Sequence, residues 1–243
     1  MNIDKNWVEM NYNGEASFVI PDSVTCIGED AFAYCENITK ITIPNSVTKI
    51  GDYAFYGCLS LKSIIIPDGV MSIGKYAFHN CKSLENITIP NGVTSIGQKA
   101  FHGCTSLKSI FIPNGVTIID HGVFSGCKSL ENICIPDGVT SIDNRAFYCC
   151  TSLKSIYIPD GVTSIGNRAF YYCTSLKSIT IPDSVTSISK KAFYGCLSLE
   201  NISIPDSVMN IDEDAFLGCK TIITYKENAG NCDKDDNRFN LGL

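Results

Sequence analysis

Cysteine and histidine are the side chains of this chain that could do chemistry, because thiolates and imidazoles bind metals and act as nucleophiles. The sequence contains 13 cysteines and three histidines. Two short motifs, His79-Asn80-Cys81 and His102-Gly103-Cys104, place an imidazole two residues from a thiol and resemble paired zinc half-sites. Zinc requires ligands that converge on one point, so the meaning of both motifs depends on where their side chains point.

The spacing of the residues sets that direction. Nine cysteines recur with a constant 23-residue period from Cys35 to Cys219, and all nine prolines recur at the same interval from Pro21 to Pro205. A fixed period of this length is typical of a solenoid, in which each coil of chain stacks only on its neighbours. Equivalent side chains of successive coils then form columns that run along the molecule.

Within each 23-residue unit, the apolar residues change their period. Ile64 and Ile66 flank a variable Ile65, which predicts a short strand with its isoleucines facing inward. Val70 and Ile73 follow the Pro-Asp-Gly turn and predict a second short extended piece. Residues 77–84 place Ala, Phe, Cys and Leu at helical spacing, so we expect one or two helical turns there.

This arrangement favours packing over chemistry for the cysteine column. Equivalent residues of stacked coils have parallel Cβ vectors at about 4.8 Å, whereas a disulfide needs converging Cβ atoms near 3.8 Å. We therefore expect reduced, inward thiols that act as small hydrophobic groups. His79 and His102 occupy a variable surface position shared with Tyr56 and Tyr148, so no metal site is predicted. Cys134 lies at an outward strand position and is the candidate reactive thiol.

The repeated motif Ala-Phe-x-x-Cys-x-x-Leu-x-x-Ile-x-Ile-Pro resembles the BspA-like (treponemal-type) leucine-rich repeat, over about residues 18–225. The resemblance implies an α/β solenoid: a right-handed superhelix of about nine 23-residue coils. One parallel sheet would form its strand face, with short helical turns opposite. Similar repeats occur in bacterial and protozoan surface proteins linked to adhesion, which implies a cell-surface or secreted protein.

The two ends depart from the repeat. Residues 1–20 are predicted to be a cap, in which Asn13-Gly14 joins a β-hairpin, the alternative being a frayed tail. Glu15 stands where a repeat carries leucine, so this segment is not expected to form a full coil. The solenoid is predicted to span 21–227, with Ile222 in the leucine column and Tyr225 and Glu227 replacing the strand isoleucines. Residues 228–243 are predicted to be a polar tail.

Composition and motifs narrow the classes of function. The net charge is −6 and no basic stripe is present, which argues against nucleic-acid binding. No apolar run is long enough to insert in a membrane, and the first ten residues lack the apolar core of a signal peptide. A cytoplasmic location is therefore the alternative. No phosphate-binding, hydrolase or dinucleotide motif appears, so no catalytic residue, cofactor or enzyme activity is predicted.

Partner binding is predicted on the outward positions of the strands. An apolar centre with a polar border is typical of protein-binding patches, and aromatic residues dominate their energetics. The alternative is that these residues are ordinary strand formers. The hypothesis is a non-catalytic interaction module that binds a protein or extracellular-matrix partner, or alternatively an intracellular leucine-rich repeat scaffold. The proposed contact residues are Ile65, Phe111, Cys134 and Tyr157, with Asn86 and Asn132 in the neighbouring row.

Overall fold

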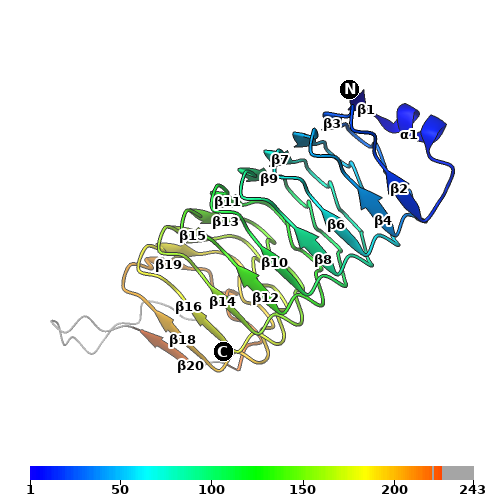
Figure 1. The fold of residues 1–243 in the computed structure, drawn as a ribbon. Helices are drawn as coiled ribbons and strands as arrows, with labels where there is room; N and C mark the ends of the chain where they lie inside the picture. Colours follow the sequence, from blue (N-terminus) through cyan, green and yellow to red (C-terminus); the bar gives the residue numbers. More distant parts are fainter. Residues whose placement is uncertain (221, 226–243) are drawn as a thin grey trace.

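The computed structural model describes residues 1–220 and 222–225, and it is an elongated solenoid of ten stacked coils (Figure 1). Each coil contributes one strand to the strand face, where every pairing is parallel. Paired coils up to residue 204 align at the 23-residue period, as Ile64 does with Ile87. The strands of this face are β2 (Ser17–Val19), β4 (Lys40–Thr42), β6 (Ser63–Ile65), β8 (Asn86–Thr88), β10 (Ser109–Phe111), β12 (Asn132–Cys134), β14 (Ser155–Tyr157), β16 (Ser178–Thr180), β18 (Asn201–Ile204) and β20 (Ile222–Tyr225).

Where one sheet was expected, hydrogen bonding divides the strand face into three parallel sheets, β2-β4-β6-β8, β10-β12 and β14-β16-β18-β20. The second extended piece of each coil forms a further parallel column, which consists of two sheets. Its strands are only two residues long, because the turn chemistry on both sides leaves no room for more. They pair in the same register, as Ile50 does with Ile73. These strands are β1 (Asn2–Ile3), β3 (Cys26–Ile27), β5 (Lys49–Ile50), β7 (Ser72–Ile73), β9 (Ser95–Ile96), β11 (Ile118–Ile119), β13 (Ser141–Ile142), β15 (Ser164–Ile165), β17 (Ser187–Ile188) and β19 (Asn210–Ile211).

Where one or two helical turns were expected, the structure has a series of hydrogen-bonded turns instead of a helix. Cys81 N–H donates to Phe78 O at 3.2 Å, but Phe78 N–H donates to Ala100 O of the next coil at 2.8 Å. Tyr76 and Asn80 have φ of 55° and 58°, and such left-handed residues break a helix. Alternate N–H groups thus bond within the turn and to the next coil, which ties the coils together here as the strands do elsewhere.

The core consists of repeated columns. The nine phenylalanines from Phe32 to Phe216 stack with centroids 5.1–5.8 Å apart and planes within 14°. Beside them the cysteine thiols are unpaired, and Cys127 Sγ donates to Phe101 O at 3.2 Å. Burial raises the pKa of Cys81 and Cys127 to about 12. The predicted packing role of these thiols is confirmed.

The predicted N-terminal hairpin is wrong. Residues Lys5–Asn11 form helix α1, capped by Asp4, whose carboxylate accepts a bond from Trp7 N at 2.9 Å. Strand β2 pairs parallel with β4, not with the preceding segment. The Trp7 and Tyr12 rings pack edge-on against Phe18, which in turn packs on Phe32 at 5.7 Å.

An aromatic cluster thus covers the end of the phenylalanine column, and the segment makes an additional coil despite Glu15. Only tertiary packing distinguishes this helix from a hairpin strand, because seven residues are too few to form a stable helix alone. The predicted cap boundary at residue 20 stays a prediction.

The last described coil is shorter than predicted. Strand β20 aligns Asn201 with Ile222, whereas the 23-residue period would place Thr224 opposite Asn201. Ile223 and Tyr225 therefore oppose Ile202 and Ile204, and Ile222 does not lie in the leucine column. The predicted end of the solenoid at 227 and the tail 228–243 lie outside the described residues.

Candidate binding surface on the strand face

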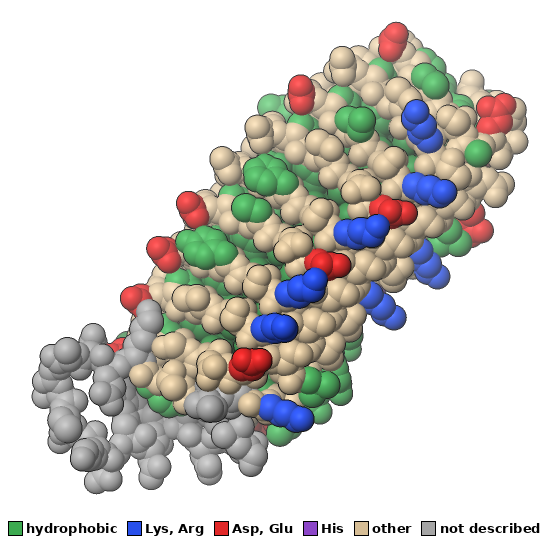
Figure 2. All heavy atoms as spheres, turned by 60° about the horizontal axis from the view of Figure 1, so that its bottom comes forward, with side chains coloured by type: hydrophobic (Ala, Val, Ile, Leu, Met, Phe, Trp, Pro, Cys, Tyr) green, Lys and Arg blue, Asp and Glu red, His purple; other side chains and the backbone are tan. Residues whose placement is uncertain are grey.

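The strand face presents its variable residues to solvent. Most three-residue strands bury the middle side chain and expose the two at the ends, as β10 does with Ile110 buried. In β2 and β12 the middle residues, Phe18 and Ile133, are half-buried. The exposed fractions are 73% for Ile65, 50% for Phe111 and 53% for Tyr157, and Cys134 is also exposed. Figure 2 shows hydrophobic side chains standing on this face among polar ones. The outward placement predicted for these four residues is confirmed.

The register brings three of the four together. Phe111 is the direct strand partner of Cys134, and Tyr157 occupies the equivalent place on β14, the next coil along. Ile65 lies apart from them, since its strand partner is Thr88 on β8. The apolar row thus consists of an aromatic–thiol–aromatic segment on three consecutive coils and one separate isoleucine.

The two asparagines lie in the neighbouring exposed row. Asn86 pairs with Ser63, and Asn132 pairs with Ser109. Within residues 1–220 and 222–225, neither asparagine side chain has a hydrogen-bond partner. Their amides are available to donate to or accept from a bound partner.

One exposed apolar residue of the row was missed by sequence reasoning. Val19, 67% exposed, ends β2 and pairs with Thr42. The alternation Ser17-Phe18-Val19 carries the strand signal, but the Asn13-Gly14 pair favours a hairpin interpretation of this segment. The row therefore begins one coil earlier than predicted.

A charged row borders these residues. Lys108 Nζ lies 3.3 Å from a carboxylate oxygen of Glu85, and Lys154 Nζ lies 2.7 Å from one of Glu131. Figure 2 shows the row as largely alternating basic and acidic side chains. The hydrogen bond from Lys154 lowers the pKa of the Glu131 carboxyl. These exposed pairs are screened by solvent and act mainly on the register between coils.

The histidine–cysteine motifs do not form metal sites. Cys81 and Cys104 point into the core, where each thiol donates to a phenylalanine carbonyl. The His79 and His102 rings stack on each other with centroids 4.6 Å apart. Burial lowers the pKa of both imidazoles, that of His79 to about 4. Among the described residues no group of three or more metal-ligating side chains converges.

Comparison with known proteins agrees with the coil geometry. A family model for the BspA-type leucine-rich repeat region matches residues 10–114 and 94–223. The chain belongs to the BspA-type leucine-rich repeat family. The resemblance expected from its 23-residue motif is thereby confirmed.

Solved structures of bacterial leucine-rich repeat proteins share this fold. A Bacteroides ovatus leucine-rich repeat protein is 33% identical with a TM-score of 0.68, and the match covers 88% of this chain and 64% of that one. A Faecalibacterium prausnitzii leucine-rich cell surface protein is 28% identical, with a TM-score of 0.54 over 88% and 89% of the two chains. The T. pallidum leucine-rich repeat protein is 28% identical, with a TM-score of 0.55 over 77% and 79%.

Two further findings concern the chain. None of the curated proteins compared with it matches. In the part of the chain that the structure describes, no helix is long and apolar enough to cross a membrane.

Proposed function

We propose that this BspA-type repeat protein is a non-catalytic interaction module that binds a protein partner through its strand face. The observation that carries the proposal is the exposed segment of Phe111, Cys134 and Tyr157 on three consecutive strands, of which β10 pairs with β12 and β14 pairs with β16. Large aromatic side chains on a rigid surface lose little entropy on binding and dominate hot spots.

The surroundings of this segment complement the aromatic pair. Asn86 and Asn132 supply free amides next to the row, and Ile65 extends its apolar area. Interfaces commonly combine such an apolar centre with a polar rim. The proposed partner is a protein or extracellular-matrix component rather than a nucleic acid, because the net charge is −6.

The test compares partner capture by the native protein and by a Phe111→Ser/Tyr157→Ser variant. The matched control is Met71→Ser/Met209→Ser, which removes two exposed apolar side chains, 65% and 75% exposed, outside the row. We expect the row variant to lose the captured partner and the control to keep it. A purified partner that binds the folded row variant as tightly as the native protein would exclude this surface.

The compartment is a separate part of the proposal. The F. prausnitzii relative is described as a cell surface protein, and the same location is proposed here, with an intracellular scaffold as the alternative. Protease treatment of intact cells separates the two. Digestion of the protein supports the surface location, and protection until lysis supports the scaffold.

A further inference from the structure

A second ordered surface lies on the turns, where one position of the repeat carries an aromatic or imidazole ring in six repeats and Ala33, Ser125 or Leu217 in the others. His79 stacks on Tyr56 with centroids 4.7 Å apart, and Tyr148 stacks on Tyr171 at 4.9 Å. We call this set the ring row; in chain order it is Tyr56, His79, His102, Ser125, Tyr148, Tyr171 and Tyr194. Ser125 is its one member without a ring, so the stack is interrupted there.

From Lys99 onward a row of cations accompanies the ring row three residues earlier in the chain, whereas the two preceding coils carry Tyr53 and Tyr76 at this position. Tyr148 N–H donates to Arg145 O at 3.1 Å, and the same turn links Tyr171 to Arg168 at 3.3 Å. Arg168 and Lys191 lie over the rings of their own coils, Tyr171 and Tyr194, whereas Lys99 lies over Tyr76 of the preceding coil. The cation row is Lys99, Gly122, Arg145, Arg168 and Lys191. Gly122 is its one member without a charge.

Gly122 and Ser125 belong to the same coil, and the backbone of this coil follows the same path as that of the other coils. Ser125 N–H donates to Gly122 O at 3.0 Å, as His102 N–H does to Lys99 O at 3.1 Å. Gly126 N–H still bonds to Tyr148 O of the next coil at 2.7 Å. Only the side chains of this coil are smaller, and they leave a space beside them. The Lys99 side chain fills part of it, since a Cβ at Gly122 would lie 3.1 Å from Lys99 Cγ, and Ser125 at its base is buried.

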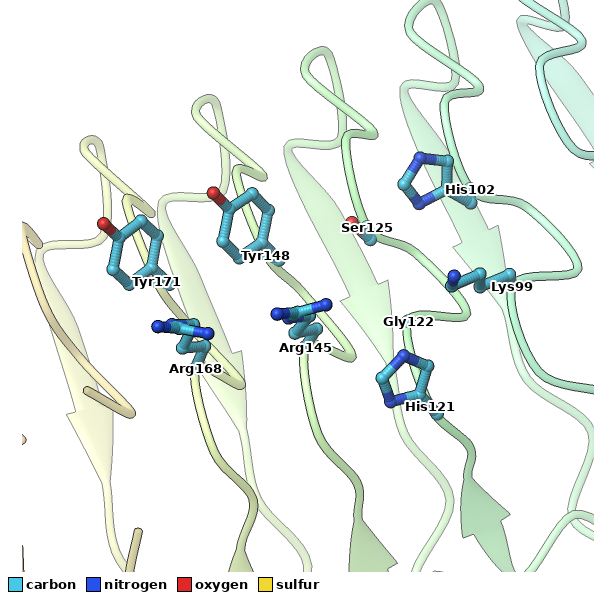
Figure 3. Close-up of a pocket in the computed structure, with 9 residues that line it drawn as sticks. All are labelled: Lys99, His102, His121, Gly122, Ser125, Arg145, Tyr148, Arg168 and Tyr171. Carbon is cyan, nitrogen blue, oxygen red and sulfur yellow. The ribbon is translucent and has the colours of Figure 1, made fainter. Parts of the chain in front are cut away.

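That space is a pocket of about 380 Å³, which we call the turn notch. Figure 3 shows the rings of His102 and Tyr148 on either side of Ser125, with the guanidinium groups of Arg145 and Arg168 below the tyrosine rings. The volume is within the range of small-molecule sites. The residues that line it are Lys99, His102, His121, Gly122, Ser125, Arg145, Tyr148, Arg168 and Tyr171.

The cations of the turn notch have no carboxylate partner. No ion pair within residues 1–220 and 222–225 involves Lys99, Arg145 or Arg168, whereas Lys191, outside the notch, lies 3.8 Å from Asp214. Two of the three lie instead over tyrosine rings, Lys99 at 5.4 Å from the Tyr76 centroid and Arg168 at 5.9 Å from that of Tyr171. Such ring contacts leave the positive charge uncompensated.

This charge indicates the class of ligand. The nearby Asp120 carboxylate accepts a bond from His121 N at 2.6 Å, and among the described residues it forms no ion pair with a cation of the notch. Three cations without counter-charges in one concave site of an acidic protein favour an anion. The guanidinium groups of Arg145 and Arg168 suit a phosphate, because a guanidinium can donate two parallel hydrogen bonds to phosphate oxygens.

The gap in the ring row has the width of one aromatic ring. His102 and Tyr148 are two coils apart, which corresponds to about 9–10 Å. A ring midway between them would lie about 4.7 Å from each, close to the spacing within the row itself. We propose that the turn notch binds an aryl phosphate, whose ring replaces the missing ring beside Ser125 while its phosphate contacts Lys99, Arg145 and Arg168.

The repeat supplies a variant that closes the notch without disturbing the fold. Gly122→Arg/Ser125→Tyr gives this coil the pair that the next two coils carry, so folding is expected to be preserved. Calorimetric titration with phenyl phosphate is expected to show saturable binding to the native protein and none to this filled variant. Arg145→Gln/Arg168→Gln should weaken binding about tenfold or more. The matched control Lys190→Gln removes an exposed charge outside the notch and should change affinity by less than about twofold.

Phenol and inorganic phosphate test the two parts of the ligand separately, and each should bind more weakly than phenyl phosphate. A phosphotyrosine peptide distinguishes the source: tighter binding than phenyl phosphate indicates a modified protein, and equal or weaker binding indicates a small molecule. The proposal is overturned by the absence of saturable binding at millimolar phenyl phosphate. It is also overturned if inorganic phosphate binds equally well, or if the filled variant retains affinity. None of these outcomes depends on the partner of the strand face.

Discussion

The phenylalanine column and the ring row are both stacks of aromatic side chains, yet they obey different constraints. Every coil from Phe32 to Phe216 contributes a fully buried phenylalanine. The ring row instead mixes tyrosine, histidine and, once, serine. The inner stack tolerates no omission because a missing ring would leave a cavity that no solvent fills.

The outer stack tolerates an omission because water can occupy the gap. Its rings add contacts between coils but do not close the core. The buried columns vary only among apolar residues, as Val123 does in the alanine column, whereas the ring row also admits a polar residue.

The largest expected effect comes from breaking the inner column. Phe147→Ala should lower the free energy of unfolding by about 3–5 kcal/mol, since a buried ring is lost and a cavity remains. The matched control Phe111→Ala removes a phenylalanine side chain from the exposed strand face. It should change the free energy of unfolding by less than about 0.5 kcal/mol. Denaturant unfolding of both variants measures the difference. Equal losses would contradict the inside–outside distinction.

A smaller effect is expected in the cysteine column. Cys127→Ala removes a buried thiol and its bond to Phe101 O, which should cost about 1–2 kcal/mol. Cys134→Ala removes an exposed thiol and should be close to neutral. Thermal unfolding of the pair under reducing conditions is the measurement. A neutral Cys127→Ala would show that sulfur contributes nothing to packing here.

Acid should destabilise the fold through the histidines of the ring row. Folding lowers the pKa of His79 to about 4 and also lowers that of His102, chiefly by burial. Between pH 6.5 and 4 the unfolded chain therefore binds more protons than the folded one, so stability falls as the pH falls.

Replacing the histidines isolates this contribution from that of the carboxylates. A His79→Tyr/His102→Tyr variant, which extends the tyrosine stack, should lose less stability over this range. Melting temperatures of both proteins at several pH values provide the test. Parallel curves for the two would exclude the imidazoles as the cause.

The smallest effect on stability is expected for Phe111→Ser/Tyr157→Ser, within about 0.5 kcal/mol for each residue, because both side chains stand half-exposed on the sheet. The same variant is expected to lose its partner. Circular dichroism and unfolding curves check the first expectation. A large loss of stability would mean that Phe111 and Tyr157 stabilise the sheet as ordinary strand-forming residues.

The sequence determined the columns of this protein. The recurrence of Val, Ile, Phe, Cys and Leu with a 23-residue period requires stacked coils, because no single coil can bury those side chains alone. The outward placement of Ile65, Phe111, Cys134 and Tyr157 follows from strand alternation, which is a local property.

The tertiary structure decided what happens where the period fails or where rows meet. Trp7 and Tyr12 lie in and just after a helix because their rings pack against Phe18, and β20 shifts in register because pairing with β18 sets it. The turn notch depends on which side chains of different coils come together. The sequence pattern gives the period of a solenoid, but contacts between coils depend on the directions of the side chains, which only packing determines.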